Sequence, residues 1–232
     1  MNEEDIKNFN TALSLYQNDY PHQSLIEMLK NGNIIEKQIA TLKLTNINSQ
    51  NDAEALISNL TGQDGKIREA VSFKIKEFMN NKNYLPYFYS IKNYDIFLDA
   101  IIDINGNICR NTISAITNMK NNKEFCKHFC QKLTGLTQKL IDKISTFDLQ
   151  DGKYKVNKEV FKLYWCLETI YIFYDKVDMP TLKSILLKTK SIQDYTIREK
   201  TAKILSKNFQ DNDLIKIREE LKKDKNYYVR RF

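Results

Sequence analysis

Glycine, proline and histidine are scarce in this sequence. Its 232 residues include 6 Gly, 3 Pro and 2 His, while 42% are hydrophobic. So few turn formers argue against an all-β sandwich, and this apolar content argues against a disordered chain. With only His22 and His128 present, most general acid–base designs and imidazole-based metal sites are excluded, and His22 is interpreted as a surface residue. We therefore expect a globular, helical protein.

An apolar signal segment and a membrane-spanning run are also missing. The N-terminus reads MNEEDIKNFN, and no stretch approaches the roughly 20 apolar residues that span a bilayer. We therefore expect a cytoplasmic protein without a membrane partner. A reducing cytosol predicts that all four cysteines are free, structural thiols: Cys109, Cys126, Cys130 and Cys166.

One short segment has residue types that zinc prefers, because it contains Cys126, His128 and Cys130. On a helix the two cysteines share a face, whereas His128 is turned away from them by about 200°. A fourth ligand is missing nearby, and the sequence has no glycine-rich phosphate-binding loop. We predict no metal and no cofactor.

The positive charge is concentrated in the last third of the chain. Residues 1–152 hold 17 Lys+Arg against 18 Asp+Glu, whereas residues 153–232 hold 19 against 11. This asymmetry indicates either that one end of the molecule meets an anionic partner or that a lysine-rich background composition has drifted unevenly.

Five segments share a short pattern, and the chain stops within a sixth copy. In each, a turn containing Gly, Asn or Asp leads into Ile or Val, with apolar or small residues four and five positions later. Another follows eight positions after the anchor, except in the copy at Ile35, where Leu42 stands at seven and is predicted to join the apolar positions. The anchor residues are Ile35, Ile67, Ile108, Val156, Ile197 and Val229. Their successive spacings of 32, 41, 48, 41 and 32 residues fit two helices per unit. An amphipathic segment precedes each anchor, at 24–30, 53–60, 94–104, 127–145, 180–190 and 212–223.

Three of the anchors are followed directly by arginine, in the pairs Ile67-Arg68, Ile197-Arg198 and Val229-Arg230. With the small residues that follow the first two, these segments resemble HEAT-type repeats, whose second helix begins with an aspartate-containing turn and Val-Arg. The other copies depart from this pattern, since Arg110 lies one place late and no arginine follows Ile35 or Val156.

The resemblance implies an all-α fold, a right-handed α-α superhelix of stacked helical hairpins. It implies one repeat domain over residues 1–232, with about five to six hairpins in 24–232 and a capping helix in 1–22. Arg68, Arg198 and Arg230 would then bridge to an acid or carbonyl in the adjoining turn or repeat and set the stacking angle.

In this family the second helices line a concave face, so their solvent positions follow from the anchors. Offsets of two, three, six, seven and ten place these basic residues there: Lys37, Lys74, Arg110, Lys158, Lys162, Lys200, Lys203 and Lys207. We expect a non-enzymatic scaffold that holds a partner protein or peptide on a concave, partly basic face. The alternative is a nucleic-acid-binding protein that uses five lysines of this face against phosphates, namely Lys158, Lys162, Lys200, Lys203 and Lys207.

The only tryptophan, Trp165, lies in an aromatic segment with Glu168 and Asp175 nearby. Core packing explains these aromatics best. The alternative is an architectural similarity to HEAT-like alkylpurine DNA glycosylases, in which aromatic residues and a carboxylate line a basic cleft; this version requires an exposed Trp165. The last copy, Tyr227 to Phe232, is either part of a longer array or an aromatic, basic docking surface.

Overall fold

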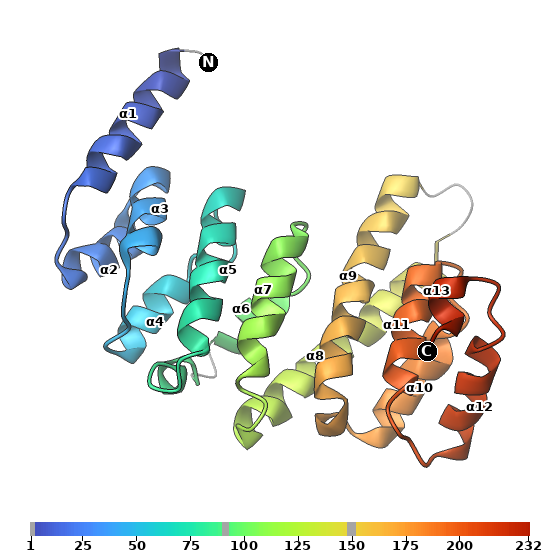
Figure 1. The fold of residues 1–232 in the computed structure, drawn as a ribbon. Coiled ribbons are helices and arrows are strands. Elements are labelled where there is room, and N and C mark those ends of the chain that lie inside the picture. Colours follow the sequence, from blue (N-terminus) through green and yellow to red (C-terminus); the bar gives the residue numbers. More distant parts are fainter. Residues whose placement is uncertain (1–2, 90–92, 148–151) are drawn as a thin grey trace. The chain divides into compact units, whose positions relative to one another are not determined.

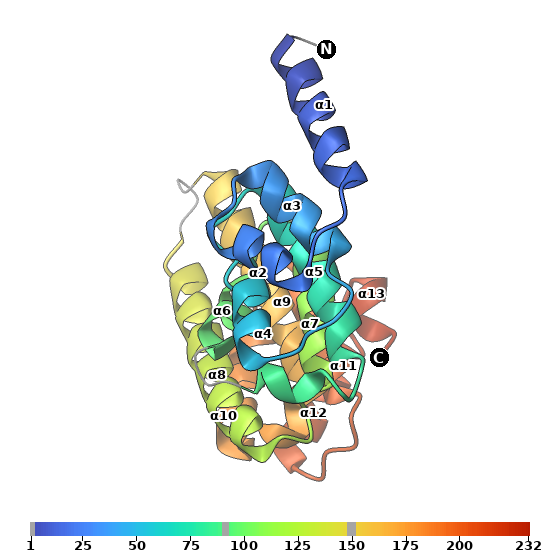
Figure 2. The ribbon, with the colours of Figure 1, turned by 90° about the vertical axis from the view of Figure 1, so that its left-hand side faces the viewer.

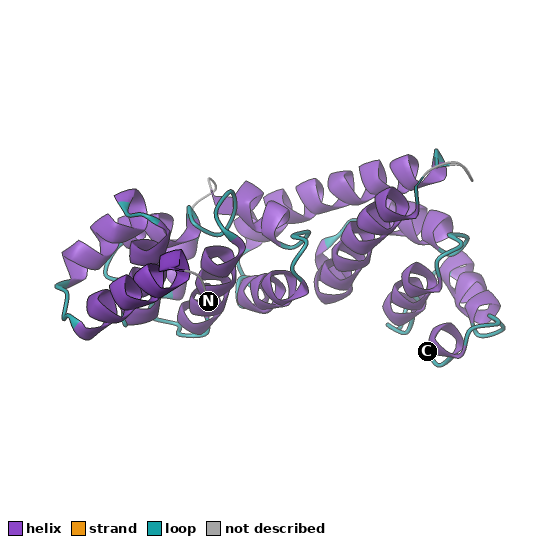
Figure 3. Cartoon of the chain, turned by 90° about the horizontal axis from the view of Figure 1, so that it is seen from above, coloured by secondary structure: helices purple, strands orange, loops and turns teal. Residues whose placement is uncertain are grey.

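A computed structural model describes residues 3–89, 93–147 and 152–232, with side chains from residue 10 onward apart from that of Asn93. The described residues form helices and loops, without strands (Figure 3). No helix among them is long and apolar enough to cross a membrane. Contacts divide the chain into two compact units, unit 1 (Met1–Met119) and unit 2 (Lys120–Phe232). The single repeat domain over 1–232 stays a prediction.

Unit 1 is built from α-helices and one short 3-10 helix (Figure 1). These are α1 (Glu3–Gln17), α2 (His22–Asn31), α3 (Ile34–Lys43), α4 (Gln50–Ile57), α5 (Gly65–Met79), η1 (Leu85–Phe88), α6 (Asn93–Ala100) and α7 (Gly106–Thr117).

Unit 2 is likewise built from α-helices and one short 3-10 helix. They are α8 (Lys123–Ser145), α9 (Lys153–Phe173), η2 (Tyr174–Lys176), α10 (Met179–Thr189), α11 (Tyr195–Leu205), α12 (Asn212–Leu221) and α13 (Tyr227–Arg230).

The repeat pattern is confirmed as a series of helical hairpins. Each anchor lies near the start of what we call a second helix, namely α3, α5, α7, α9, α11 or α13, and each preceding amphipathic segment forms a first helix. Within unit 1, α3 packs on α5 and α5 on α7; within unit 2, α9 packs on α11 and α11 on α13. This stacking of helical hairpins is that of an all-α, α-α superhelix fold.

Capping side chains explain why the second helices begin where they do. Five of these helices start after an Asn or Asp whose side-chain oxygen accepts a hydrogen bond from a first-turn amide: Asn33, Asp64, Asn105, Asp194 and Asn226. Such a cap stabilises a helix by roughly 1 kcal/mol. The turn residues in the sequence pattern are therefore the N-caps of these helices.

Four of the six anchors are fully buried, namely Ile67, Ile108, Ile197 and Val229. Ile35 and Val156, which belong to the copies that lack arginine, are only half-buried. Leu42, which the sequence pattern places with the apolar positions of α3, is instead 57% exposed.

Two of the arginines after the anchors join their hairpin to a turn of the next one, whereas Arg230 bonds to the turn before its own helix. The Arg68 guanidinium bonds to both carboxylate oxygens of Asp103 at 2.8 and 3.2 Å. In unit 2, Arg198 meets both oxygens of Asp224 at 2.6 and 3.3 Å, while Arg230 donates to the carbonyl oxygens of Asp224 and Lys225. That these bridges set the stacking angle stays a prediction.

The N-terminal helix, α1, lies against α3 and projects away from the rest of unit 1 (Figure 2). Tyr16 lies beneath the Lys43 ammonium, 4.9 Å from its ring centre, and Leu13 is 46% exposed. Ile6, Phe9, Leu13 and Tyr16 recur at helical spacing in the sequence, which predicts that they share one face of the helix. The side chains of Ile6 and Phe9 lie outside the described set. The capping role of residues 1–22 stays a prediction.

His22 is half-buried, with 25% of its side chain exposed, and it makes a contact that the sequence did not indicate. Its Nε2 lies 2.8 Å from a carboxylate oxygen of Asp52, which also accepts hydrogen bonds from the Asn48 amide and the Ser49 hydroxyl. Burial opposes ionisation of Asp52, but these hydrogen bonds outweigh it and lower the pKa of the carboxyl. The sequence pattern missed this contact because 30 residues separate the partners.

All four cysteines are free and buried. Burial raises the pKa of the Cys130 and Cys166 thiols to about 12 and also raises that of Cys126. These three thiols are therefore protonated at neutral pH and are poor nucleophiles.

Candidate functional site

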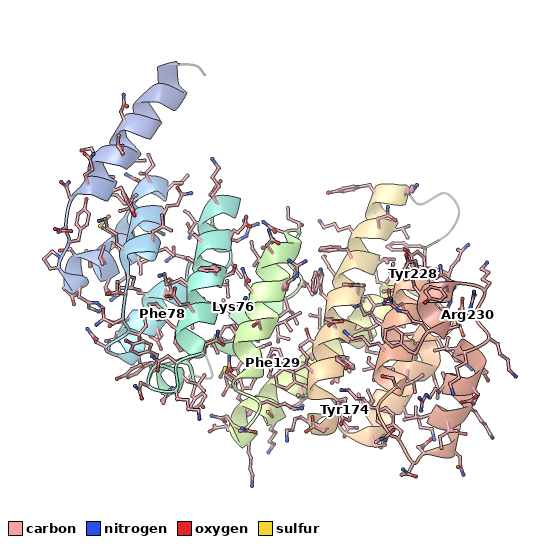
Figure 4. The ribbon with its side chains drawn as sticks, in the orientation of Figure 1. Lys76, Phe78, Phe129, Tyr174, Tyr228 and Arg230 are labelled. Carbon is pink, nitrogen blue, oxygen red and sulfur yellow. The ribbon has the colours of Figure 1, made fainter. Side chains whose placement is uncertain are left out.

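The basic residues predicted in unit 2 meet a row of tyrosines along the facing surfaces of α9 and α11. Spacings of three and four residues place the members of each row on one helical face. We call this set the lysine–tyrosine ladder; it comprises Tyr164, Glu168, Tyr171, Tyr174, Lys200, Lys203 and Lys207. Tyr174 lies at the C-terminal end of α9, where Figure 4 labels it.

Glu168 neutralises part of the ladder. Its carboxylate lies 2.7 Å from the Lys200 ammonium and 2.8 Å from that of Lys203. Burial opposes ionisation of Glu168, but the hydrogen bonds from both lysines prevail and lower its pKa. Lys200 is only 7% exposed, so this pair has a structural role and Lys200 is not open to a ligand.

The tyrosine rings hold the remaining positive charge by cation–π contacts. The Lys200 ammonium lies 4.3 Å from the centre of the Tyr164 ring, and that of Lys203 lies 4.3 Å from the Tyr171 ring. Lys207 approaches the same Tyr171 ring at 4.0 Å. Contacts of this kind are worth about 0.5–1 kcal/mol at exposed sites and more when desolvated. The ladder therefore presents ordered ammonium groups instead of freely moving ones.

The other two predicted lysines of unit 2 differ from each other. Lys162 lies 3.4 Å from Glu159, a carboxylate that is 5% exposed and also 2.8 Å from Lys143. Lys158 is exposed and has no ionic partner among the described residues. Only one of the five lysines proposed for this face is thus both exposed and unpaired.

Trp165 lies in the core of unit 2 and does not face solvent. It is 8% exposed, and its ring packs edge-on against Phe161 and Tyr164 at centroid distances of 6.1 and 5.2 Å. Trp165 lies nine positions after Val156 on α9, on a side of this helix that is buried. A role for Trp165 in stacking on a base, which requires exposure, is therefore wrong.

The predicted residues Lys74 and Arg110 belong to unit 1 and are not part of the ladder. The Lys74 ammonium lies 2.9 Å from Glu77 and 5.6 Å from the centre of the Phe78 ring. Arg110 is exposed and donates a hydrogen bond of 3.0 Å to the side-chain oxygen of Asn107.

Sequence reasoning missed two exposed apolar residues on the second helices of unit 1. Leu42 on α3 and Phe73 on α5 are 57% and 59% exposed, and both line one depression of about 460 Å³. Its other lining residues are Thr41, Glu69, Ala70, Lys74, Asn107 and Asn111. We call this surface the Leu42–Phe73 face.

A signal for this face was present in the sequence. Phe73 lies six positions after Ile67 and Leu42 seven after Ile35, which are offsets that place a residue in solvent. The prediction of a ligand-binding face included only basic residues at those offsets, and it placed Leu42 with the buried apolar positions of α3.

Among the described residues, no group of three or more His, Cys, Asp or Glu side chains could hold a metal ion. Two carboxylates of unit 2, the buried Glu159 and the half-buried Glu168, are each held by two lysines.

Comparisons with known proteins identify no family for this chain. No family model matches it, and no curated protein matches its sequence. Among solved structures, an engineered protein is similar over 92% of this chain and 93% of its own, with 12% identity and a TM-score of 0.49. A designed armadillo repeat protein is similar over 91% of this chain and 96% of its own, with 16% identity and a TM-score of 0.44.

Proposed function

We propose that this protein is a non-enzymatic scaffold that binds a partner protein or peptide through exposed faces of its second helices. One observation carries the proposal. Leu42 and Phe73, on adjacent second helices, expose more than half of their apolar side chains beside a shared depression. Exposed aromatic and aliphatic side chains around a depression are typical anchors of a protein contact.

The surroundings of this depression support a peptide-like ligand. Polar groups of Glu69, Asn107 and Asn111 line it beside the apolar anchors. Glu69 is held in place by the amide groups of Asn105 and Asn107, at 3.1 and 2.8 Å. A ligand that offers one apolar side chain and backbone polar groups fits this mixture.

Nucleic-acid binding remains the alternative proposal, and the charge pairing in unit 2 weighs against it. Phosphate binding needs several cations that are free to replace counterions. Lys200 and Lys203 are committed to Glu168, and Lys162 to Glu159. Lys158 and Lys207 are the candidates that retain charge without a carboxylate partner among the described residues.

The four buried thiols also support a location in a reducing compartment, and we propose the cytoplasm. Free cysteines persist there without oxidation. Fractionation of the cells that produce the protein tests this assignment.

Site-specific photocrosslinking tests the proposed function. A photoreactive phenylalanine analogue replaces Phe73 in the full chain, the native cells are irradiated, and crosslinked species are identified by mass spectrometry. Ile104 is the matched control, because it is a large apolar residue of unit 1 that is 75% exposed and does not line the depression. We expect one protein to be captured at position 73 and not at position 104.

Two results would contradict the proposal. Equal capture at positions 73 and 104 would mean that exposure alone governs the contact. Tight, salt-sensitive binding of a fluorescent duplex or single strand that is lost in a Lys158→Glu/Lys207→Glu variant would favour the nucleic-acid alternative.

A further inference from the structure

Unit 2 contains a second exposed surface, which arises from a mismatch in helix length. The hairpin of α8 and α9 has helices of 23 and 21 residues, whereas α10 and α11 have 11 each. At about 1.5 Å per residue, ten extra residues extend a helix by about 15 Å. The N-terminal part of α9 accordingly reaches beyond α11 (Figure 1).

The overhanging end of this hairpin and the turn between α10 and α11 enclose a groove of about 1500 Å³. The floor is apolar, with Ile141 and Ile144 from α8 and Val156 and Val160 from α9. Tyr195, which is 42% exposed, stands at the α11 side. The anchor Val156 is only half-buried because it lies in the part of α9 that α11 does not cover.

The charges around the groove are unbalanced. Lys188 is paired with Asp142 at 3.3 Å, and Arg198 is committed to Asp224. Lys153 and Lys225 also line the groove, are exposed, and form no salt bridge among the described residues, although Lys225 lies near the Asp224 carboxylate that Arg198 holds. Asp194 lines the groove too, and its side chain caps α11. Exposed lysines therefore outnumber the acidic groups open to a ligand beside the apolar floor.

Unit 2 as a whole repeats this imbalance. It contains 25 Lys+Arg against 15 Asp+Glu, so its net charge is +10. A surface of this sign raises the rate of encounter with acidic ligands and repels basic ones. An apolar floor, by contrast, offers nothing to the phosphates of a nucleic acid.

We infer that this groove docks an amphipathic segment of a partner protein that bears apolar side chains flanked by carboxylates. The apolar side chains would cover the α8–α9 floor, and the carboxylates would pair with Lys153 and Lys225. This inference goes beyond the proposed function, because it assigns a separate site in unit 2 and does not involve the Leu42–Phe73 face.

Selection from a displayed library of random 12-residue peptides tests the inference with the full chain as bait. We expect the enriched peptides to carry net negative charge and several large apolar residues. The best of them, labelled with fluorescein, are then titrated by fluorescence anisotropy against the protein and its variants.

The Lys153→Glu/Lys225→Glu variant should weaken binding about tenfold or more, because repulsion replaces two attractive contacts. Val156→Ser should also weaken it, by removing part of the apolar floor. Lys216→Glu, an exposed lysine of α12 outside the groove, is the matched control and should change affinity less than about twofold. Thermal unfolding of each variant shows that it is folded.

Three outcomes would overturn the inference: no enrichment, enrichment of neutral or basic peptides, or affinity that is indifferent to the groove variants. If the selected peptides instead lose binding in a Phe73→Ser variant, the groove proposal fails while the proposed function stands. If the peptides lose binding in the groove variants and photocrosslinking at Phe73 captures nothing, the groove proposal stands and the proposed function fails.

Discussion

The two units use one scaffold but carry opposite charge. Unit 1 holds 11 Lys+Arg against 14 Asp+Glu, a net charge of −3, whereas unit 2 has a net charge of +10. Both stack capped second helices, and both contain an arginine that reaches an aspartate in the next turn. Their exposed second-helix positions differ, since unit 1 presents Leu42 and Phe73 where unit 2 presents lysines over tyrosines. Buried positions therefore specify the repeat, and the exposed offsets are free to define separate binding surfaces.

The largest expected effect is specific to unit 2. Glu168→Gln removes the carboxylate that neutralises Lys200, a lysine that is 7% exposed. Leaving a buried charge unpaired should reduce the free energy of unfolding by about 3 kcal/mol. Urea unfolding followed by circular dichroism measures this loss. Lys158→Gln is the control and should change stability by less than about 0.5 kcal/mol; an equal loss in both variants would show that the pair does not stabilise the unit.

A smaller effect should be shared by the two units. Two matched variants test this, Arg68→Lys in unit 1 and Arg198→Lys in unit 2. Each replaces a bidentate guanidinium–carboxylate contact by a single ammonium–carboxylate contact. We expect each to cost about 1–2 kcal/mol in the same unfolding experiment. A large loss for one arginine and none for the other would contradict the view that both units rely on the same bridge.

Acidic pH should lower the stability of unit 2 more than that of unit 1. Lowered pKa values of Glu159, Glu168 and Asp224 in unit 2 mean that their ionised forms favour the folded state. Their contribution is present above the unfolded-state pKa of about 4 and is lost as the pH falls through the lower folded-state values.

In unit 1 two carboxyl groups act in opposite directions. Hydrogen bonds lower the pKa of Asp52, so its contribution is also lost in acid, whereas burial and the nearby Asp95 raise the pKa of Asp99, whose protonation favours the folded state. We expect hydrogen exchange, measured by mass spectrometry from pH 5 to pH 3, to report loss of protection in 120–232 before 1–119. Simultaneous loss would contradict this order.

The smallest effect on stability is expected at the proposed binding face of unit 1. Phe73→Ser removes an exposed ring, so the free energy of unfolding should change by less than about 0.5 kcal/mol. Binding of the crosslinked partner should nevertheless be lost, as measured by titration of the purified pair. Leu187→Ser, at a 42% exposed residue of unit 2, should leave both quantities unchanged.

The repeat architecture was predictable because it depends on local periodicity. Turn residues that cap helices and apolar residues at helical spacing are visible in a single sequence, and they located all six second helices. The boundaries were less exact. The helix expected at 127–145 begins at Lys123, because Asn122 caps it, and the one expected at 94–104 ends at Ala100.

The surfaces were harder to predict because they depend on residues far apart in the chain. The lysines of α11 are neutralised by a carboxylate 32 and 35 residues earlier, a pairing that helical spacing within one segment does not reveal. The groove depends on the difference in length between two hairpins. The burial of Trp165, by contrast, was predictable, because core packing was the favoured interpretation of its aromatic segment.

Arg68 and Arg198 make their hairpins depend on the ones that follow them. If the turn holding Asp224 opened, the Arg198 guanidinium, which is 11% exposed in the closed structure, would lose its carboxylate partner. The cost of that loss would fall on the preceding hairpin, so damage would spread along the stack. We expect a unit to melt cooperatively, as one body, and not to fray hairpin by hairpin from an end.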